Sequence, residues 1–382
     1  MTAPIVIIGS GLAGYNTARG LRRLDPATPL LIITADGGEF YSKPMLSEAF
    51  SAGKTPETLP ISSAVQMTEQ LKAIVRPHTR VTAIEPELKR VRIAEEALEY
   101  SKLVLAIGAE QNRLPLEGSG ADRIVSVNSL DDYARLRGTL TGKTTVAIVG
   151  AGLIGCEFAN DLSGAGFKVD LIDIADQPLP RLLPAAGAAL LKEKLAANGV
   201  KWYLGTSMKA VDGDGDALKL TLATGETLSA EVVLSAIGLS PKIALAQTAG
   251  LKVNCGIVVN RYLETSISDM YALGDCAEVE GLVLPFIMPI THASRALAAT
   301  LAGKRTAVVY PPMPVLVKTP ACPTIVSPPA TGAAGEWQVT QEPDSVKSLF
   351  VEASGKLLGF ALNGKATAER AKLTQQLPPV LS

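Results

Sequence analysis

The sequence predicts an α/β protein with two copies of one strand–helix–strand unit and a small α+β domain at its C-terminal end. The first copy is indicated by Gly9, Gly11 and Gly14, which form the pattern G-x-G-x-x-G directly after the apolar run Ile5–Ile8. The same pattern returns 141 residues later (150 − 9), after a second apolar run. Beyond about residue 310, prolines cluster and short alternating segments follow. A repeat of this length indicates duplication of a whole fold unit rather than a short solenoid repeat.

Each glycine of the first unit answers a steric need. Gly9 permits a tight turn, Gly11 lets a pyrophosphate approach the backbone, and Gly14 lets the next helix pack close to the strand. The helix is expected over about 12–24, with its N-terminal N–H groups facing the phosphates. A second apolar run, Leu30–Ile33, is expected as the next strand, and Asp36 lies shortly after it, near the usual place of a ribose-binding carboxylate. We therefore predict a Rossmann-like unit that binds a dinucleotide through Gly9, Ser10, Gly11, Leu12, Ala13, Gly14, Thr34, Ala35 and Asp36.

The second unit repeats this arrangement. Thr145–Val149 is expected as its first strand, and Gly150, Gly152 and Gly155 as its glycine turn. Asp173 ends the next strand, 18 residues after the last of these glycines (173 − 155). Two such units in one chain predict two bound dinucleotides.

The other segments are expected to connect and cover these units. The runs LVLAIG (103–108) and EVVLSAIG (231–238) each enter a glycine where the chain passes between units. Met270–Leu273 is expected as a strand with Gly274 and Asp275 at its functional end. The further expected elements are a turn and short helix within 40–50, antiparallel strands at 81–84 and 90–93, tail strands at 348–352 and 357–362, and a helix over 366–377. The predicted domains are 1–111 with 240–310, 112–239, and 311–382.

Composition excludes several functional classes. The net charge of −1, with 19% charged residues, gives no overall attraction to nucleic acid or to an anionic membrane. No run approaches the roughly 18 apolar residues of a membrane span, and the chain enters its first strand at once, which predicts a cytoplasmic protein without a leader. Four separated cysteines and two histidines predict neither a metal site nor a redox dithiol.

The motifs GSGLAG, GAGLIGCE and YALGDCAE together resemble the flavoproteins of the glutathione-reductase type, which bind two dinucleotides. Within that superfamily the chain is most similar to the rubredoxin–NAD(+) reductases of bacterial alkane oxidation, through YSKPMLS, GAGLIGCEFANDL, ALGDCAEV and VKTPAC. The resemblance covers the whole chain. It implies noncovalent FAD in the first unit, whose domain is discontinuous in sequence, and NADH as substrate in the second.

The resemblance also implies roles for individual residues. Asp275 would accept a hydrogen bond from a ribityl hydroxyl, and Glu157 would face the place where nicotinamide meets flavin. Lys43 and Lys318 would stabilise negative charge on the flavin or its pyrophosphate. Glu157, Lys43 and Lys318 are the three residues expected to take part in catalysis. Two further cofactor contacts, through backbone groups, are implied for Val81 and Ile287.

Two positions bear on specificity and mechanism. By the same resemblance, Asp173 of this chain would accept hydrogen bonds from the adenosine ribose hydroxyls and would repel a 2′-phosphate. This favours NADH over NADPH. Glu48 stands where ferredoxin-type relatives often carry a lysine that approaches the flavin. We therefore expect no ion pair between position 48 and Glu157, and any mechanism that depends on such a pair is in doubt.

The electron acceptor is indicated by what the 40–48 segment lacks. Thiol-dependent members of the superfamily need one or two cysteines beside the flavin, and this segment contains none. The residues alone leave a one-electron protein, a quinone or oxygen open as acceptors, whereas the resemblance favours rubredoxin. The alternatives are an NADH:ferredoxin reductase, a low-specificity NADH reductase or oxidase, and a non-enzymatic NADH-sensing flavoprotein.

Overall fold

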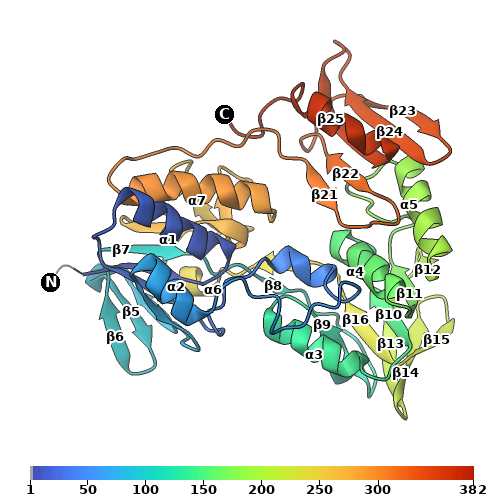
Figure 1. Cartoon of the computed structure of the whole chain (residues 1–382), viewed down its shortest axis with the longest axis horizontal. Coiled ribbons are helices and arrows are strands. Elements are labelled where there is room, and N and C mark those ends of the chain that lie inside the picture. The colour runs from blue at the N-terminus through green and yellow to red at the C-terminus, as the bar shows by residue number, and fades with distance from the viewer. Residues whose placement is uncertain (1–2) are drawn as a thin grey trace.

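The computed structural model describes residues 3–382 as two Rossmann-like domains and a small C-terminal α+β domain (Figure 1). The predicted fold class is therefore confirmed. Each Rossmann-like domain contains a five-stranded parallel sheet, and the C-terminal domain contains a five-stranded antiparallel sheet.

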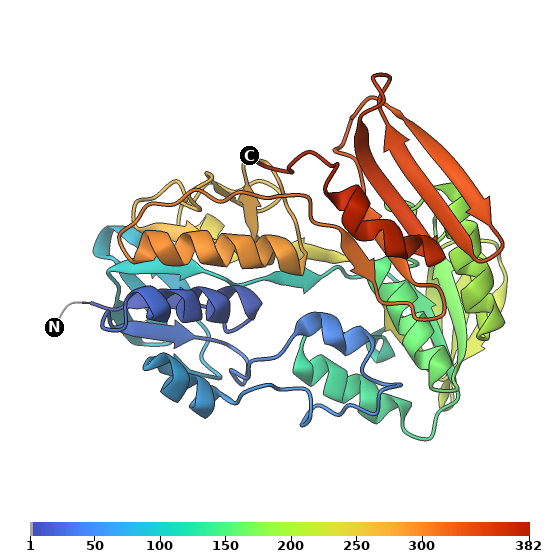
Figure 2. The same ribbon diagram turned by 45° about the horizontal axis from the view of Figure 1, so that its top comes forward.

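The first parallel sheet has the strand order β19-β7-β1-β2-β3. Its strands are β19 (Met270–Ala272), β7 (Lys102–Leu105), β1 (Ile5–Ile8), β2 (Leu30–Ile33) and β3 (Ile74–Arg76). Every residue of β1 and β2 is buried, as expected for parallel strands covered on both faces. Helices α1 (Leu12–Leu24) and α7 (Ile287–Leu301) lie side by side next to this sheet (Figures 1 and 2). The expected bounds of β1, α1 and β2 are confirmed.

The second parallel sheet has the order β12-β11-β10-β16-β9. Its strands are β12 (Val200–Leu204), β11 (Lys168–Asp173), β10 (Thr145–Val149), β16 (Val232–Ser235) and β9 (Val125–Ser126). The helices of this domain are α3 (Leu130–Leu140), α4 (Leu153–Gly164) and α5 (Ala185–Ala197). The two sheets thus repeat one arrangement, in which a glycine turn joins the central strand to a helix.

The two domains are joined by a pair of crossing segments. β8 (Ala109–Gln111) and β17 (Leu239–Pro241) pair antiparallel, with Gln111 opposite Leu239. The predicted boundaries at 111 and 240 lie within this pair.

The remaining elements of the two Rossmann-like domains are short helices, 3₁₀ turns and strands outside the two parallel sheets. They are η1 (Lys43–Ser47), α2 (Ala64–Leu71), β4 (Ala83–Glu85), η2 (Pro86–Leu88), β5 (Arg90–Ile93), β6 (Glu96–Glu99), η3 (Ala121–Arg123), β13 (Met208–Asp214), β14 (Ala217–Leu222), β15 (Thr227–Ala230), α6 (Ala244–Thr248), β18 (Ile257–Val259), η4 (Gly274–Cys276) and β20 (Ala277–Val279).

The C-terminal sheet has the order β21-β22-β25-β24-β23 and lies against α5 (Figure 2). Its strands are β21 (Val315–Val317), β22 (Thr324–Ser327), β25 (Leu357–Gly364), β24 (Ser345–Val351) and β23 (Glu336–Glu342). Val317, Val326 and Val346 are buried in one hydrophobic core with α4 and α5. The C-terminal domain is therefore anchored on the second Rossmann-like domain by shared apolar packing.

Three expected elements differ from the structure. The strand expected at 348–352 begins three residues earlier, as β24 (Ser345–Val351). The helix expected over 366–377 is instead a 3₁₀ turn, η5 (Lys365–Glu369), followed by a short helix, α8 (Arg370–Thr374). The N–H of Ala366 donates to Ser345 Oγ and the hydroxyl of Thr367 donates to the Gly364 carbonyl, so side chains take hydrogen bonds at the start of this segment. The strand expected at 81–84 begins at Ala83.

Candidate active site

A cavity of about 730 Å³ opens at the edge of the first sheet where its parallel strands end. The volume lies within the usual range of cofactor sites, roughly 300–1,000 Å³. β1, β2, β7 and β19 run parallel, so the segments that follow them meet at this edge. The cavity brings together twelve of the predicted site residues: Gly9, Ser10, Gly11, Leu12, Ala13, Thr34, Ala35, Asp36, Lys43, Val81, Asp275 and Ile287.

The first glycine turn forms one wall of this cavity. Gly9 has φ +113°, a conformation that residues with a side chain rarely adopt. A Cβ on Gly14 would lie 2.0 Å from the Gly9 carbonyl oxygen, so the helix packs against the turn only because Gly14 has no side chain. A Cβ on Gly11 would meet nothing within 4 Å, because Gly11 faces open space. The turn therefore leaves room for a group at the N-terminus of α1, where an anion is stabilised.

Asp36 is held in place by a local hydrogen-bond network. Its Oδ1 accepts from Ser10 Oγ at 2.9 Å, from the Thr34 hydroxyl and from the Gly38 N–H at 3.2 Å. Three donors on one oxygen fix the carboxylate at the end of β2, at the cavity. This geometry suits a carboxylate that accepts ribose hydroxyls.

Asp275 and Lys43 approach the cavity from η4 and η1. Asp275 Oδ1 is buried without a hydrogen-bond partner among residues 3–382. Burial raises the pKa of Asp275, and the charge of Lys43 opposes this rise. Lys43 is exposed and lines the cavity, and desolvation by the surrounding protein lowers its pKa. A buried carboxylate oxygen without a partner needs a donor, which a ribityl hydroxyl of a bound flavin nucleotide would supply.

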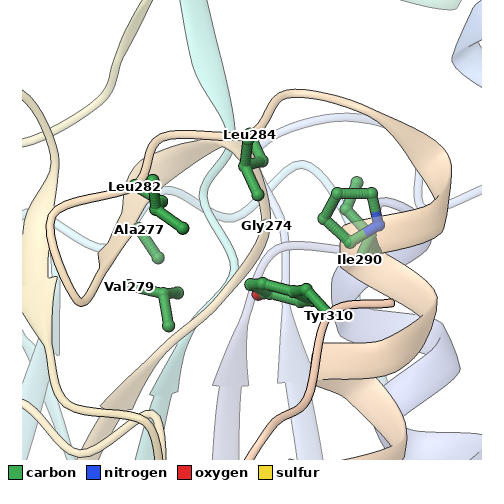
Figure 3. Close-up of a pocket in the computed structure, with 8 residues that line it drawn as sticks. Gly274, Ala277, Val279, Leu282, Leu284, Ile290 and Tyr310 are labelled. Atoms are coloured by element: carbon green, nitrogen blue, oxygen red, sulfur yellow. The ribbon is translucent and has the colours of Figure 1, made fainter. Parts of the chain in front are cut away.

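A second, much smaller cavity of about 10 Å³ lies behind the turn that carries Asp275 (Figure 3). The side chains that line it are apolar apart from the phenol of Tyr310, whose ring lies beside Gly274 and Ile290 in Figure 3. Burial raises the pKa of Tyr310 to about 12. A space of this size holds about one water molecule, so this cavity is packing behind the turn rather than a ligand site.

The second glycine turn lies beside the cavity rather than in its wall. Gly150, Gly152 and Gly155 do not line the cavity, but Ile154 and Phe158 of the following helix α4 do. Gly150 has φ +109°, close to the value for Gly9 in the first turn. The start of α4 therefore faces the same space as the first turn.

Asp173 also lies outside the cavity, at the end of β11. Its Oδ2 accepts from the Ala151 N–H at 2.5 Å, and its Oδ1 accepts from the Ala175 N–H at 2.7 Å. The side chain of Ile174 is 77% exposed. The carboxylate is thus fixed against the second glycine turn, next to an exposed apolar residue.

Glu157 and Lys318 form an ion pair immediately behind the cavity wall. Glu157 is fully buried; its Oε1 accepts from the Lys318 N–H at 3.0 Å, and its Oε2 accepts from Ser47 Oγ at 2.5 Å and from the Lys318 ammonium. As expected, Glu48 forms no ion pair with Glu157; Lys318 supplies the pairing cation from the C-terminal domain instead.

Several lining residues were not predicted from the sequence. They come from η1, from the crossing segments and from the start of α3: Tyr41, Pro44, Ser47, Glu110, Gln111, Asn128, Ser129, Asp131, Asp132, Ser235, Gly238, Leu239 and Lys242. Most of these residues follow a parallel strand at its carboxyl end or border η1. The rule that ligands bind beyond the carboxyl ends of parallel strands could have identified these residues from the sequence.

No cysteine is among the residues that line the cavity. Cys156, Cys276 and Cys322 are buried, and Cys255 alone of the four is exposed. Burial raises the pKa of Cys276 to about 11, so its thiolate is disfavoured. The cavity thus offers no thiol to accept electrons.

Comparison with known proteins places this architecture in a family. The family model described as pyridine nucleotide-disulphide oxidoreductase matches residues 3–299, and the chain belongs to this family. A second model, described as the rubredoxin binding C-terminal domain, matches residues 307–377.

Individual relatives show which kind of oxidoreductase within this family the chain is similar to. The chain is 49% identical to a rubredoxin-NAD(+) reductase of Alcanivorax borkumensis, over 99% of both chains. It is 46% identical to a protein of the same name from Acinetobacter baylyi, over 97% of this chain and 96% of that one. The resemblance to rubredoxin–NAD(+) reductases inferred from the sequence is confirmed.

Among solved structures, the ferredoxin reductase of the CYP199A2 system from Rhodopseudomonas palustris is similar, with a TM-score of 0.89 at 25% identity. The likeness covers 100% of this chain and 96% of that one. Over residues 3–382, no helix is long and apolar enough to cross a membrane.

Proposed function

We propose that this protein is an FAD-dependent NADH:rubredoxin reductase that supplies electrons to an alkane hydroxylase system. The observation that carries the proposal is a cavity with a glycine turn, Lys43 and an unpartnered Asp275 oxygen, but no thiol in its lining. Two relatives named rubredoxin-NAD(+) reductase and the match of residues 307–377 to a rubredoxin-binding domain support rubredoxin as the acceptor.

The first Rossmann-like domain would hold FAD without a covalent bond. The N-terminus of α1 and the space beside Gly11 suit the pyrophosphate, Asp36 suits a ribose, and Asp275 suits a ribityl hydroxyl. Lys43, and Lys318 behind the wall, would bring positive charge to the flavin end of the cavity. Val81 and Ile287 line the cavity where backbone contacts to the cofactor are expected. When bound, the flavin accepts a hydride and releases electrons one at a time.

The second Rossmann-like domain would hold NADH. Gly150, Gly152 and Gly155 suit its pyrophosphate, and Asp173 suits the ribose hydroxyls. Ile154 and Phe158 of α4 would place the nicotinamide at the cavity, where orientation is the chief contribution of the protein. We take the domains as 1–111 with 240–310, 112–239, and 311–382, and the cytoplasm as the location.

The proposal is tested by reconstituting the purified protein with FAD and comparing its turnover with rubredoxin, ferredoxin and a quinone. We expect stoichiometric flavin absorbance and a kcat/KM for rubredoxin at least about tenfold above the other acceptors. The ferredoxin reductase alternative predicts the opposite order, and a low-specificity reductase predicts similar values for all three.

A further inference from the structure

Residues 41–59 form an arm of the first Rossmann-like domain that lies on the second one (Figures 1 and 2). At the base of this arm the Phe40 N–H donates to the Ser62 carbonyl at 2.8 Å. Beyond the base, η1 lies against α3 and α4 of the second domain. We call residues 41–59 the η1 arm. It brings Lys43, the first residue of η1, to the cavity.

Hydrogen bonds hold the η1 arm to the other two domains rather than to its own. Among residues 3–382, every hydrogen bond that leaves the arm ends on α3, on α4 or on Lys318 of the C-terminal domain. On α4, Asp161 Oδ2 accepts from the Phe50 N–H at 2.9 Å. Its Oδ1 accepts from the Ser51 N–H at 3.0 Å and from the Ser51 hydroxyl. One carboxylate of the second domain thus binds the tip of the arm through three donors.

Helix α3 holds the same tip from the other side. The Tyr133 hydroxyl donates to the Lys54 carbonyl at 2.9 Å, and Arg137 donates to the same carbonyl at 3.0 Å. The buried side chains of the arm share one hydrophobic cluster with Tyr133: Leu46, Ala49 and Leu59. By its polar and its apolar contacts, the arm is therefore fixed to the second domain.

The anchor on α4 is costly to release. Asp161 is buried, and burial raises its pKa, while the hydrogen bonds from Ser51 and Phe50 oppose this rise. If the arm moved away, a buried carboxylate would lose its donors, and such a loss carries the full desolvation penalty. Lys43 has no comparable support, because within the described residues its ammonium has no hydrogen-bond partner. Its place in the cavity therefore depends on the backbone of the arm.

We propose that Asp161 and Tyr133 are positioning residues for Lys43. By anchoring the η1 arm on the second Rossmann-like domain, they hold the Lys43 ammonium at the flavin end of the cavity. The domain expected to bind NADH thereby also places a cation of the FAD site. The proposal rests on the proposed function, because it takes Lys43 as a contact of bound FAD.

Trypsin digestion of the full chain tests the anchor without any cofactor. Trypsin cleaves after lysine, and the Lys54 carbonyl belongs to a bond that it would attack. We expect Asp161→Asn, which replaces an acceptor oxygen by a donor, and Tyr133→Phe each to speed cleavage after Lys54 at least about fivefold. Mass spectrometry of the fragments over time measures this rate, and an unchanged rate in both variants would overturn the proposal.

Glu231→Gln is the matched control for both variants. Glu231 also accepts several hydrogen bonds within the second domain, but its donors are Thr144 and Thr145 rather than residues of the arm. Cleavage after Lys54 should therefore stay within about twofold of wild type. Equal acceleration in this control would indicate general destabilisation and would count against the anchor.

A double-mutant cycle on FAD affinity tests whether the anchor acts through Lys43. Asp161→Asn should weaken FAD binding at least about fivefold in the otherwise wild-type chain, but less than about twofold in the Lys43→Met background. Tyr133→Phe, which removes one hydroxyl, should show the same dependence. Equal weakening in both backgrounds would overturn the proposal. If the wild-type chain binds no FAD, the proposed function fails, whereas the trypsin result still decides whether the arm is anchored.

Discussion

At the scale of single residues, the site contains groups whose charges are unfavourable until a ligand is present. Asp275 has an unpartnered buried oxygen and a raised pKa, while Lys43 has a lowered one. Both shifts indicate that each group is less stable in its charged form than it would be in water. A bound cofactor that donates a hydrogen bond to Asp275 and places negative charge near Lys43 would stabilise the charged forms of both groups.

Asp275→Asn should therefore stabilise the FAD-free protein and weaken FAD binding. A carboxyl whose pKa is raised on folding lowers the stability of the protein as pH rises from its unfolded value of 3.8 through its folded value, and the full penalty is present above that range. Removing the charge should raise the free energy of unfolding of the apoprotein by about 1–2 kcal/mol. Because the penalty disappears at low pH, the two proteins should converge in stability near pH 3.

Urea titrations of both apoproteins and FAD titrations measure these two effects. Asp216→Asn, at an exposed acid in the turn between β13 and β14, is the control and should change neither. A less stable Asp275→Asn apoprotein would show that the carboxylate has a structural role instead.

Cofactor preference should follow from Asp173 and its exposed neighbour Ile174. Replacing Asp173 by alanine removes the negative charge, and Ile174→Arg adds a fork that binds phosphate. The double variant should lower the NADH/NADPH ratio of kcat/KM at least about tenfold. Asp176→Ala, an exposed acid three residues away, should leave the ratio unchanged. An unchanged ratio in the double variant would refute the assignment of Asp173.

At the scale of elements, the glycines of the first glycine turn have two different roles, one in packing and one in ligand binding. A Cβ at Gly14 would lie 2.0 Å from the Gly9 carbonyl oxygen, whereas a Cβ at Gly11 would enter open space. Gly11 also has an ordinary φ of −67°. Two glycines of one motif, three residues apart, therefore serve different purposes: Gly14 allows close packing, and Gly11 leaves space for a ligand.

Gly14→Ala should destabilise the apoprotein by about 1–3 kcal/mol, because the turn and α1 must move apart. Gly11→Ala should leave its stability within about 0.5 kcal/mol but weaken FAD binding at least about tenfold, because the methyl group occupies the space expected for the pyrophosphate. Thermal unfolding of the apoproteins and FAD titration separate the two effects. Normal FAD affinity in Gly11→Ala would place the cofactor elsewhere.

The sequence predicted features whose cause is local and missed those that depend on tertiary contacts. The glycine turns and their strands have steric reasons within a few residues, whereas the role expected for Asp275 came from the resemblance to a known family. The ion pair between Glu157 and Lys318 joins positions 161 residues apart, so the sequence around Glu48 could not reveal which residue supplies the cation. The segment expected as a helix over 366–377 begins as a 3₁₀ turn, where Ser345 of β24 accepts the Ala366 N–H.

At the scale of the whole molecule, the proposed function has two half-reactions, one with NADH and one with rubredoxin, and we expect different physical factors to limit their rates. NADH enters a cavity between domains, where bound geometry sets the rate. Rubredoxin, as the resemblance implies, is small and acidic and meets a protein with a net charge of −1. Because the overall charge gives no attraction, we expect a local basic patch to steer this encounter.

The rubredoxin step should therefore weaken with salt, while flavin reduction by NADH should hardly change. The Debye length falls from about 10 Å at 0.1 M to about 3 Å at 1 M salt, which screens surface steering. Stopped-flow rates for both half-reactions over this range give the two slopes. Equal slopes, or a flat rubredoxin step, would indicate an apolar docking surface.

The central claim is that electrons pass from NADH through one bound flavin directly to rubredoxin. The most direct measurement is anaerobic double-mixing stopped flow, first with one equivalent of NADH and then with rubredoxin or ferredoxin. We predict that NADH bleaches the flavin, and that its absorbance returns as two rubredoxins are reduced per NADH, at least about tenfold faster than with ferredoxin. A flavin that NADH does not bleach, or that ferredoxin reoxidises as fast as rubredoxin does, would contradict the account.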